Sequence, residues 1–245
     1  MNDLEILYED NHLIVVIKPA GVLSQADISG APDMLTLIKA YLKEKYQKPG
    51  DVYLGLLHRL DRPVSGVMVF AKTSKCASRI SAQIREGKMK KMYRAIVCGE
   101  VSPKQGTLRG FLLKNEKDNT VKVFLPTDTS IPKDAKESSL SYRVIDKVDV
   151  TASKGAYLTL LEIDLHTGRS HQIRAQLAKA GFPILGDQKY GELKSSYTGD
   201  ICLEAYRLEF THPVRAEQMQ FERPLSDNKP WNLFMKLNNG GDTNG

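Results

Sequence analysis

The chain has 245 residues, of which 41% are hydrophobic and 26% charged, a composition typical of a globular protein with a sizeable core. Its 35 Lys and Arg residues against 29 Asp and Glu residues give a net charge of +6, which favours a polyanionic partner. No apolar run is long enough to cross a membrane, and the acidic N-terminus lacks the pattern of a secretion signal. The three cysteines have neither metal-ligand nor disulfide spacing, so we expect a cytoplasmic protein without a structural metal.

The first part of the chain predicts a hairpin, a loop and a helix. Residues 4–8 and 12–17 predict two short strands, and the Asp and Asn between them tolerate hairpin-turn geometry. Lys18 begins a Lys-Pro-Ala-Gly segment, which its proline and glycine mark as a loop. The apolar spacing of residues 33–46 predicts a helix whose lysines face solvent.

The most informative segment consists of two apolar runs, residues 54–57 and 67–71, joined by a charged turn. The apolar runs predict strands that are buried on both faces. Asp61 lies in the turn between two arginines, where a carboxylate can stay ionised while partly shielded from water. From these residues alone two interpretations stay open: a reactive carboxylate, or a structural ion pair between Asp61 and Arg59 or Arg62.

A second helix and a basic strand follow. Thr73 or Ser74 can cap this helix, and Gly87 ends it. Residues 88–99 then contain four cations within seven positions, together with one tyrosine. This pattern fits a surface that holds phosphates and stacks a base, and equally a basic edge strand that resists aggregation.

The second half of the chain predicts an antiparallel sheet and one further helix. The expected strands are residues 108–113, 120–125, 140–144 and 157–165, and residues 126–139 form a surface loop. Residues 167–169 predict a turn, after which Ser170 caps a helix that ends at Ala180. His171 and Arg174 lie on one face of this helix. His166 and His171 suggest zinc, but no third ligand has suitable spacing.

Four segments together resemble the motifs of RNA pseudouridine synthases of the RluA type. They are Lys18-Pro-Ala-Gly21, His58-Arg-Leu-Asp-x-x-x-Ser-Gly66, Lys91-x-Tyr93-x-Ala95, and Thr167-Gly-Arg-Ser-His-Gln-Ile-Arg174 with Gly186-Asp187 and Tyr190-Gly191 downstream. The resemblance extends from about Leu7 to Arg223 and keeps the family order. Two positions depart from the family pattern: Val64 stands where Thr is common, and Glu204 where His is usual.

The resemblance implies an α+β fold with a long, mainly antiparallel mixed β-sheet, flanking helices and an active cleft across the sheet. We expect residues 1–237 to form one catalytic domain and the Gly- and Asn-rich residues 238–245 to form a disordered tail. We expect no separate RNA-binding module before Leu4, so that RNA binds through the cleft itself. We also expect a monomer.

The resemblance also implies roles for three catalytic residues. Asp61 corresponds to the catalytic aspartate of the family, and Tyr93 to a tyrosine that packs against the target uracil. Arg174 corresponds to the arginine that pairs with this aspartate, and it would keep Asp61 ionised and correctly aimed. Whether Asp61 adds covalently to the ribose or assists an elimination stays open.

RNA binding is assigned to four further residues. Arg59 matches a family arginine that enters the space vacated by the flipped uridine. Lys18 is a candidate for the wall of the cleft, and Lys91 and Arg169 are candidates for contacts with phosphates.

The implied activity is the isomerisation of specific uridines in rRNA or tRNA to pseudouridine. This reaction breaks the N1–C1′ bond and rejoins the uracil through C5, without net redox change, so no cofactor and no metal is expected. Two alternatives remain: a hydrolase that releases free uracil, and a catalytically silent RNA-binding protein. The presence of Asp61, Tyr93 and Arg174 argues against the silent protein, because RNA binding alone does not require a carboxylate that faces phosphates.

Overall fold

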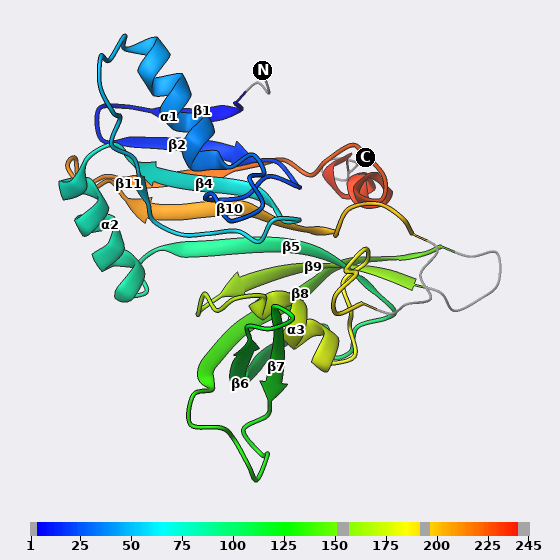
Figure 1. Ribbon diagram of the computed structural model, residues 1–245. Helices are drawn as coiled ribbons and strands as arrows, with labels where there is room; N and C mark the ends of the chain where they lie inside the picture. Colours follow the sequence, from blue (N-terminus) through cyan, green and yellow to red (C-terminus); the bar gives the residue numbers. More distant parts are fainter. Residues whose placement is uncertain (1–3, 151–156, 192–196, 240–245) are drawn as a thin grey trace. The chain divides into compact units, whose positions relative to one another are not determined.

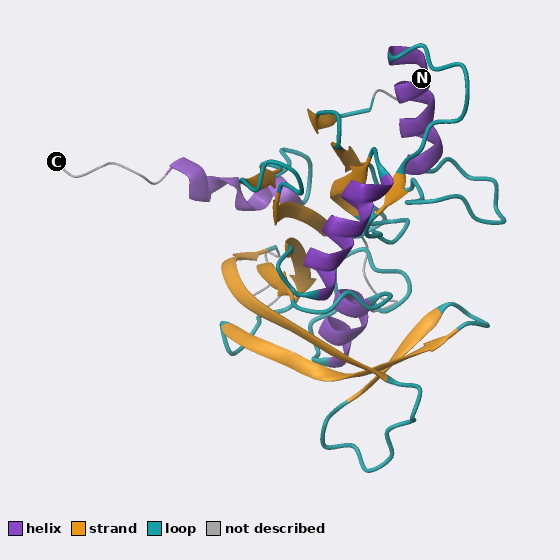
Figure 2. Cartoon of the chain, turned by 90° about the vertical axis from the view of Figure 1, so that its left-hand side faces the viewer, coloured by secondary structure: helices purple, strands orange, loops and turns teal. Residues whose placement is uncertain are grey.

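A computed structural model describes residues 4–150, 157–191 and 197–239 (Figure 1). The chain divides into two compact units. Unit 1 comprises residues 1–91 and 204–223, and unit 2 comprises residues 92–203 and 224–245. Both units combine helices with strands, and strands outnumber helices in each, which confirms the predicted α+β class. Figure 2 shows the helices and strands by colour.

Unit 1 is built on a mixed sheet. Its strands are β1 (Ile6–Glu9), β2 (Leu13–Lys18), β3 (Gly55–Leu56), β4 (Ser65–Ala71), β10 (Leu203–Thr211) and β11 (Gln218–Glu222), and its helices are α1 (Met34–Lys45) and α2 (Ser74–Arg85). The strand order runs β1-β2-β4-β10, with β11 paired to β10. Strand β10 runs parallel to β4, and the other pairs in this unit are antiparallel.

Strand β4 is the centre of this sheet. Strand β2 pairs along one of its edges, while β3 and β10 share the other edge. Strand β10 pairs with Ser65 and Gly66, and β3 pairs with Phe70 and Ala71. Because β10 occupies part of this edge, β3 has only two residues, and both are half-buried. The prediction of a fully buried strand over residues 54–57 was therefore wrong in extent, whereas the strand predicted at 67–71 is confirmed.

The two helices of unit 1 begin where the sequence predicts. Asp33 caps α1 by accepting a hydrogen bond from the Thr36 N–H at 3.1 Å. Thr73 caps α2 by accepting one from the Cys76 N–H at 3.2 Å. Gly87 follows α2 in the left-handed region, with φ +66°. Cys76 of α2 packs against side chains of β2, β4 and β10 in the core of this unit.

Unit 2 contains an antiparallel sheet. Its strands, in spatial order, are β5 (Lys90–Cys98), β9 (Tyr157–Leu165), β8 (Lys136–Asp149), β6 (Gln105–Asn115) and β7 (Thr120–Phe124). The helix α3 (Gln172–Lys179) and the 3-10 helix η1 (Trp231–Asn239) complete it. The strands predicted here are confirmed, but β8 begins at Lys136 and shortens the predicted loop.

The predicted tail and the predicted single domain are only partly covered by these elements. Asn238 and Asn239 close η1, and residues 240–245 lie outside the described residues. One catalytic domain over residues 1–237, with a cleft across its sheet, stays a prediction. Among the described residues, no helix is long and apolar enough to cross a membrane.

The pairing of β4 with β10 requires glycine at position 66. Gly66 has φ +137°, and a Cβ there would lie 2.3 Å from the carbonyl oxygen of Ala205. We predict that Gly66→Ala lowers the free energy of unfolding by about 3 kcal/mol or more, because backbone strain and steric overlap add. Urea unfolding checks this. Gly50→Ala is the matched control, since no atom lies within 4 Å of its added Cβ. Equal stability of the two variants would contradict the requirement.

Candidate active site

The predicted catalytic residue, Asp61, is half-buried in the turn between β3 and β4 of unit 1. A hydrogen bond from the Val64 N–H to the Asp61 carbonyl, 3.0 Å long, closes the turn. The Ser24 hydroxyl donates to the Leu60 carbonyl at 2.8 Å and accepts from the Leu60 N–H at 3.0 Å. Ser24 and Leu60 are both buried, so these two bonds fix the backbone immediately before Asp61.

The backbone immediately after Asp61 is fixed as well. The Arg62 carbonyl accepts hydrogen bonds from the Gly21 N–H at 2.9 Å and from the Lys18 Nζ at 3.1 Å. The Arg62 Nε in turn donates to the Gly21 carbonyl at 3.0 Å. Asp61 therefore lies between two residues whose main chain is tied to the loop that follows β2.

Lys18 is fully buried beneath this turn. Its Nζ donates to the carbonyls of Pro19, Val22 and Arg62, at 2.9, 2.6 and 3.1 Å. Burial lowers the pKa of Lys18 to about 8, although the nearby Asp61 carboxylate opposes the shift. Because all three ammonium hydrogens are donated, this arrangement argues against a direct contact between Lys18 and RNA and supports its place in the wall.

In unit 1, the basic side chains of His58 and Lys91 are also partly removed from water and have lowered pKa values. The Nε2 of His58 accepts a hydrogen bond from the Val69 N–H at 3.2 Å. Burial, together with the positive charge of Lys91, lowers the pKa of His58 to about 3, so this imidazole is neutral. Burial also lowers the pKa of the half-buried Lys91. Arg59, which is predicted to enter the space vacated by the flipped uridine, is exposed.

The two departures from the family pattern both adjoin the start of β4. Val64 is 3% exposed, so an apolar side chain suits its surroundings. Glu204 is buried opposite Ser65 in the register of β10 and β4, and one of its carboxylate oxygens lies 3.6 Å from Arg223 Nη1.

In unit 2, α3 begins differently from the prediction. His171 is its N-cap, in the left-handed region at φ 51°, without a side-chain cap. The Gln172 side chain instead accepts hydrogen bonds from the Arg169 N–H at 3.1 Å and the Thr167 hydroxyl at 2.8 Å. The prediction that Ser170 caps this helix was wrong. The side chain of Gln172, the first residue of the helix, accepts the hydrogen bonds of the preceding turn instead.

Arg174 is held by a buried ion pair. Its Nε and Nη2 donate to the two carboxylate oxygens of Asp187 at 2.9 and 2.8 Å, a bidentate arrangement. This pairing lowers the pKa of Asp187 against the opposing effect of burial. The Arg174 guanidinium lies 5.3 Å from the ring centroid of Tyr190, whose hydroxyl is 2.8 Å from His171 Nδ1. His171 and Arg174 thus share one face of α3, as predicted.

The other predicted residues of unit 2 lie on separate elements. Tyr93 is buried in β5 opposite Ile163 of β9. Arg169 is exposed, and its Nε donates to the Glu137 carbonyl at 3.0 Å. The predicted residues are divided between the units: Lys18, Arg59, Asp61 and Lys91 in unit 1, and Tyr93, Arg169 and Arg174 in unit 2. The contact predicted between Asp61 and Arg174 stays a prediction.

Three residues that position the site were missed or left without a role: Ser24, Gln172 and Asp187. Ser24 and Asp187 each follow apolar residues, in Val-Leu-Ser and Ile-Leu-Gly-Asp. A polar side chain in such a context is expected to be buried with a partner, which is the signal that could have indicated them.

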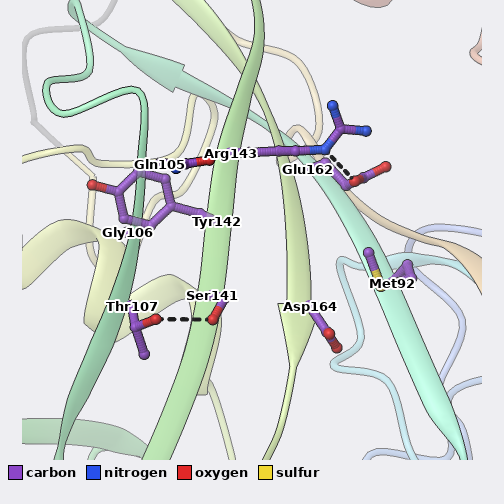
Figure 3. Close-up of a pocket in the computed structure, with 9 residues that line it drawn as sticks. All are labelled: Met92, Gln105, Gly106, Thr107, Ser141, Tyr142, Arg143, Glu162 and Asp164. Carbon is purple, nitrogen blue, oxygen red and sulfur yellow. Dashed lines mark hydrogen bonds and ion pairs between the residues drawn. The ribbon is translucent and has the colours of Figure 1, made fainter.

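Unit 2 also carries a hollow of about 470 Å³ (Figure 3). Its lining residues are Met92, Gln105, Gly106, Thr107, Ser141, Tyr142, Arg143, Glu162 and Asp164. Met92 precedes Tyr93 in β5, and successive strand side chains point to opposite faces, so the hollow lies on the face away from Tyr93. None of its lining residues is a predicted site residue. The described ranges contain no group of three or more metal-ligating side chains.

Comparison with known proteins decides the family. Residues 12–179 match the family model described as RNA pseudouridylate synthase. The chain belongs to this family. It is therefore an RNA pseudouridine synthase, an isomerase that converts uridine to pseudouridine, as the motifs predict.

Relatives and solved structures agree with this assignment. The chain is 33% identical over 236 residues to a tRNA pseudouridine synthase C of Vibrio parahaemolyticus, covering 92% of each chain. It is 32% identical to a ribosomal large subunit pseudouridine synthase D of Nitrosomonas europaea, over 91% of this chain and 62% of that protein. The structure of Human RNA Pseudouridylate Synthase Domain Containing 4 shares the fold, with a TM-score of 0.72, 21% identity, and coverage of 91% and 88% of the two chains.

The buried Lys18 predicts a rise of stability at alkaline pH. Its pKa falls from 10.5 to about 8 on folding, so between these values the unfolded chain binds more protons than the folded one. The contribution of Lys18 to the free energy of unfolding should therefore increase with pH from about 8 to 10.5, by up to about 3 kcal/mol. Urea unfolding across this range, compared with Lys18→Met, isolates the contribution. Parallel pH profiles of the two proteins would contradict it.

The buried pair of Arg174 and Asp187 predicts a large effect of Asp187→Asn. Loss of the carboxylate removes the bidentate partner of the buried guanidinium, so we expect a loss of about 3 kcal/mol or more in unfolding free energy. Glu100→Gln is the control, since it breaks the exposed pair with Lys147 in the same unit and should cost less than about 1 kcal/mol. Similar urea midpoints for both variants would contradict a large contribution of Asp187 to the free energy of unfolding.

Proposed function

We propose that this enzyme modifies specific uridines in structured tRNA or rRNA, with Asp61 acting at C1′ of the ribose. The names of its relatives support both RNA classes, since one is a tRNA pseudouridine synthase and the other a ribosomal large subunit pseudouridine synthase. Hydrogen bonds on both sides of Asp61 support its role, because a reacting group must be held in position.

The chemistry suits a single carboxylate. As the N1–C1′ bond breaks, C1′ becomes electron-poor, as it does in the cleavage of a glycosidic bond. The Asp61 carboxylate meets this centre, either by adding to it or by assisting an elimination. The detached uracil turns and rejoins through C5, which then loses its proton.

Tyr93 and Arg174 complete the proposed catalytic set. Tyr93 supports the uracil ring, and Arg174 acts with Asp61 by keeping the carboxylate charged and aligned. The bidentate pair with Asp187 supports this role, because it fixes the plane and position of the Arg174 guanidinium. The target uridine must leave its stack to reach Asp61, and Arg59 enters the vacated space.

RNA is held by exposed or half-buried cations. Lys91 and Arg169 contact phosphates, and Lys18 acts from the wall beneath the Asp61 turn rather than on the RNA itself. We further propose that the enzyme works as a monomer. We also propose that it works in the cytoplasm, since its cysteines are spaced for neither disulfides nor metal.

If Asp61 is the catalytic residue, its substitution should remove turnover and leave RNA affinity nearly unchanged. Asp61→Asn should lower pseudouridine formation in tRNA and rRNA transcripts at least a thousandfold, because the amide can act neither as nucleophile nor as base. RNA affinity, measured by fluorescence anisotropy, should stay within about twofold of the wild-type value.

Asp27→Asn is the matched control, since Asp27 is an exposed aspartate of the same unit. It should retain wild-type turnover. Residual turnover of Asp61→Asn near that of the control would remove Asp61 from the catalytic set, and release of free uracil would indicate hydrolysis instead.

A further inference from the structure

The positive charge of the chain is concentrated in one segment. Residues 72–91 contain seven Lys and Arg residues and one Glu, a net charge of +6, which equals the net charge of the whole chain. Positive and negative side chains therefore balance over the remaining residues. The segment consists of α2 and the beginning of β5, and it lies entirely in unit 1. Such a charge asymmetry marks a surface for an anionic partner.

The geometry of α2 brings several of these cations to one side. Cys76 and Ile80 face the core, so the opposite side of the helix faces solvent. At 100° per residue this outer side carries Lys75, Ser78, Arg79, Ala82 and Arg85. Ten residues separate Lys75 from Arg85, or about 15 Å along the helix axis. The small side chains between them leave room for a sugar–phosphate backbone to approach.

Several cations of the segment already have partners. Lys72 pairs with Glu9 at 2.6 Å, Lys88 pairs with Glu86 at 2.7 Å, and Arg79 Nη1 donates to a backbone carbonyl at 2.7 Å.

Three other cations of the segment are available to a ligand. They are Lys75, Arg85 and Lys90, and all three are exposed. Within the described ranges these side chains make no hydrogen bond and no ion pair within 4.0 Å.

We propose that this surface, formed by Lys75, Arg79, Arg85, Lys88 and Lys90, binds the phosphate backbone of a double-stranded arm of the RNA substrate. The inference rests on the proposed function and adds a second contact region to it. Residues 72–91 contain no Phe, Trp or Tyr, so the segment itself supplies no ring on which an unpaired base could stack. A row of cations without aromatic side chains of its own suits a duplex, whose bases face inward and whose phosphates are evenly spaced. The contact is therefore independent of sequence.

Salt dependence of binding tests the proposal. The probes are a fluorescent synthetic RNA hairpin with a stem of about one helical turn, and a single strand with the sequence of its loop. For Lys75→Gln/Arg85→Gln/Lys90→Gln, the slope of log K against log salt should become shallower by about two to three on the hairpin. Affinity for the single strand should change less than twofold. Lys39→Gln/Lys43→Gln/Lys117→Gln, which likewise removes three exposed cations, should bind both probes as the wild type does.

Three results would overturn the proposal: an unchanged slope on the hairpin, an equal loss on the single strand, or an equal loss in the control variant. Stronger competition by anionic phosphatidylserine vesicles than by duplex RNA would assign the surface to membranes instead. If the triple variant fails to fold, Lys75→Gln and Arg85→Gln are measured singly and should each change the slope by about 0.9. The binding test does not require turnover, so an inactive wild type would contradict the proposed function without touching this result.

Discussion

The hydrogen bonds that hold the turn around Asp61 are the constraint on which the site in unit 1 depends. Ser24 binds both backbone groups of Leu60, and the loop after β2 binds the carbonyl of Arg62. All of these bonds involve main-chain atoms, and the two from Ser24 are buried, so they fix the backbone on both sides of Asp61. The Lys-Pro-Ala-Gly segment and the His-Arg-Leu-Asp segment are thus hydrogen-bonded to each other, and together they fix the turn around Asp61. Both segments therefore contribute to the site, although only one carries Asp61, the proposed reactive group.

In unit 2 a side chain is likewise held in place by a neighbour. Here the neighbour is the charged carboxylate of Asp187 rather than a main-chain group. Asp187 grips Arg174 through two parallel bonds, and it also accepts hydrogen bonds from the backbone N–H groups of Lys189 and Tyr190. A buried arginine would be costly alone, and the bidentate partner offsets that cost while fixing the plane of the guanidinium. In both units a side chain with a proposed role is held by neighbours that are given no part in the proposed chemistry, as in preorganised sites.

Local signals in the sequence predicted most elements, because caps and apolar periodicity act over a few residues. Thr73 and Gly87 bound α2 as their chemistry requires. Ser170 failed as a cap because Gln172, buried by tertiary packing, satisfies the turn instead. Lys18 was predicted as a residue of the cleft wall from the resemblance of its motif, and only the three-dimensional structure shows its three carbonyl partners. Family membership followed from motif spacing, whereas the supporting contacts depend on residues distant in sequence.

The central claim is that this chain makes pseudouridine at defined uridines of tRNA or rRNA. The most direct measurement is a pseudouridine map of total cellular RNA from cells with and without the gene. The account predicts that one or a few tRNA or rRNA positions lose pseudouridine on deletion and regain it when the wild-type gene is restored. Identical maps from both strains, under conditions in which the protein is expressed, would contradict the account.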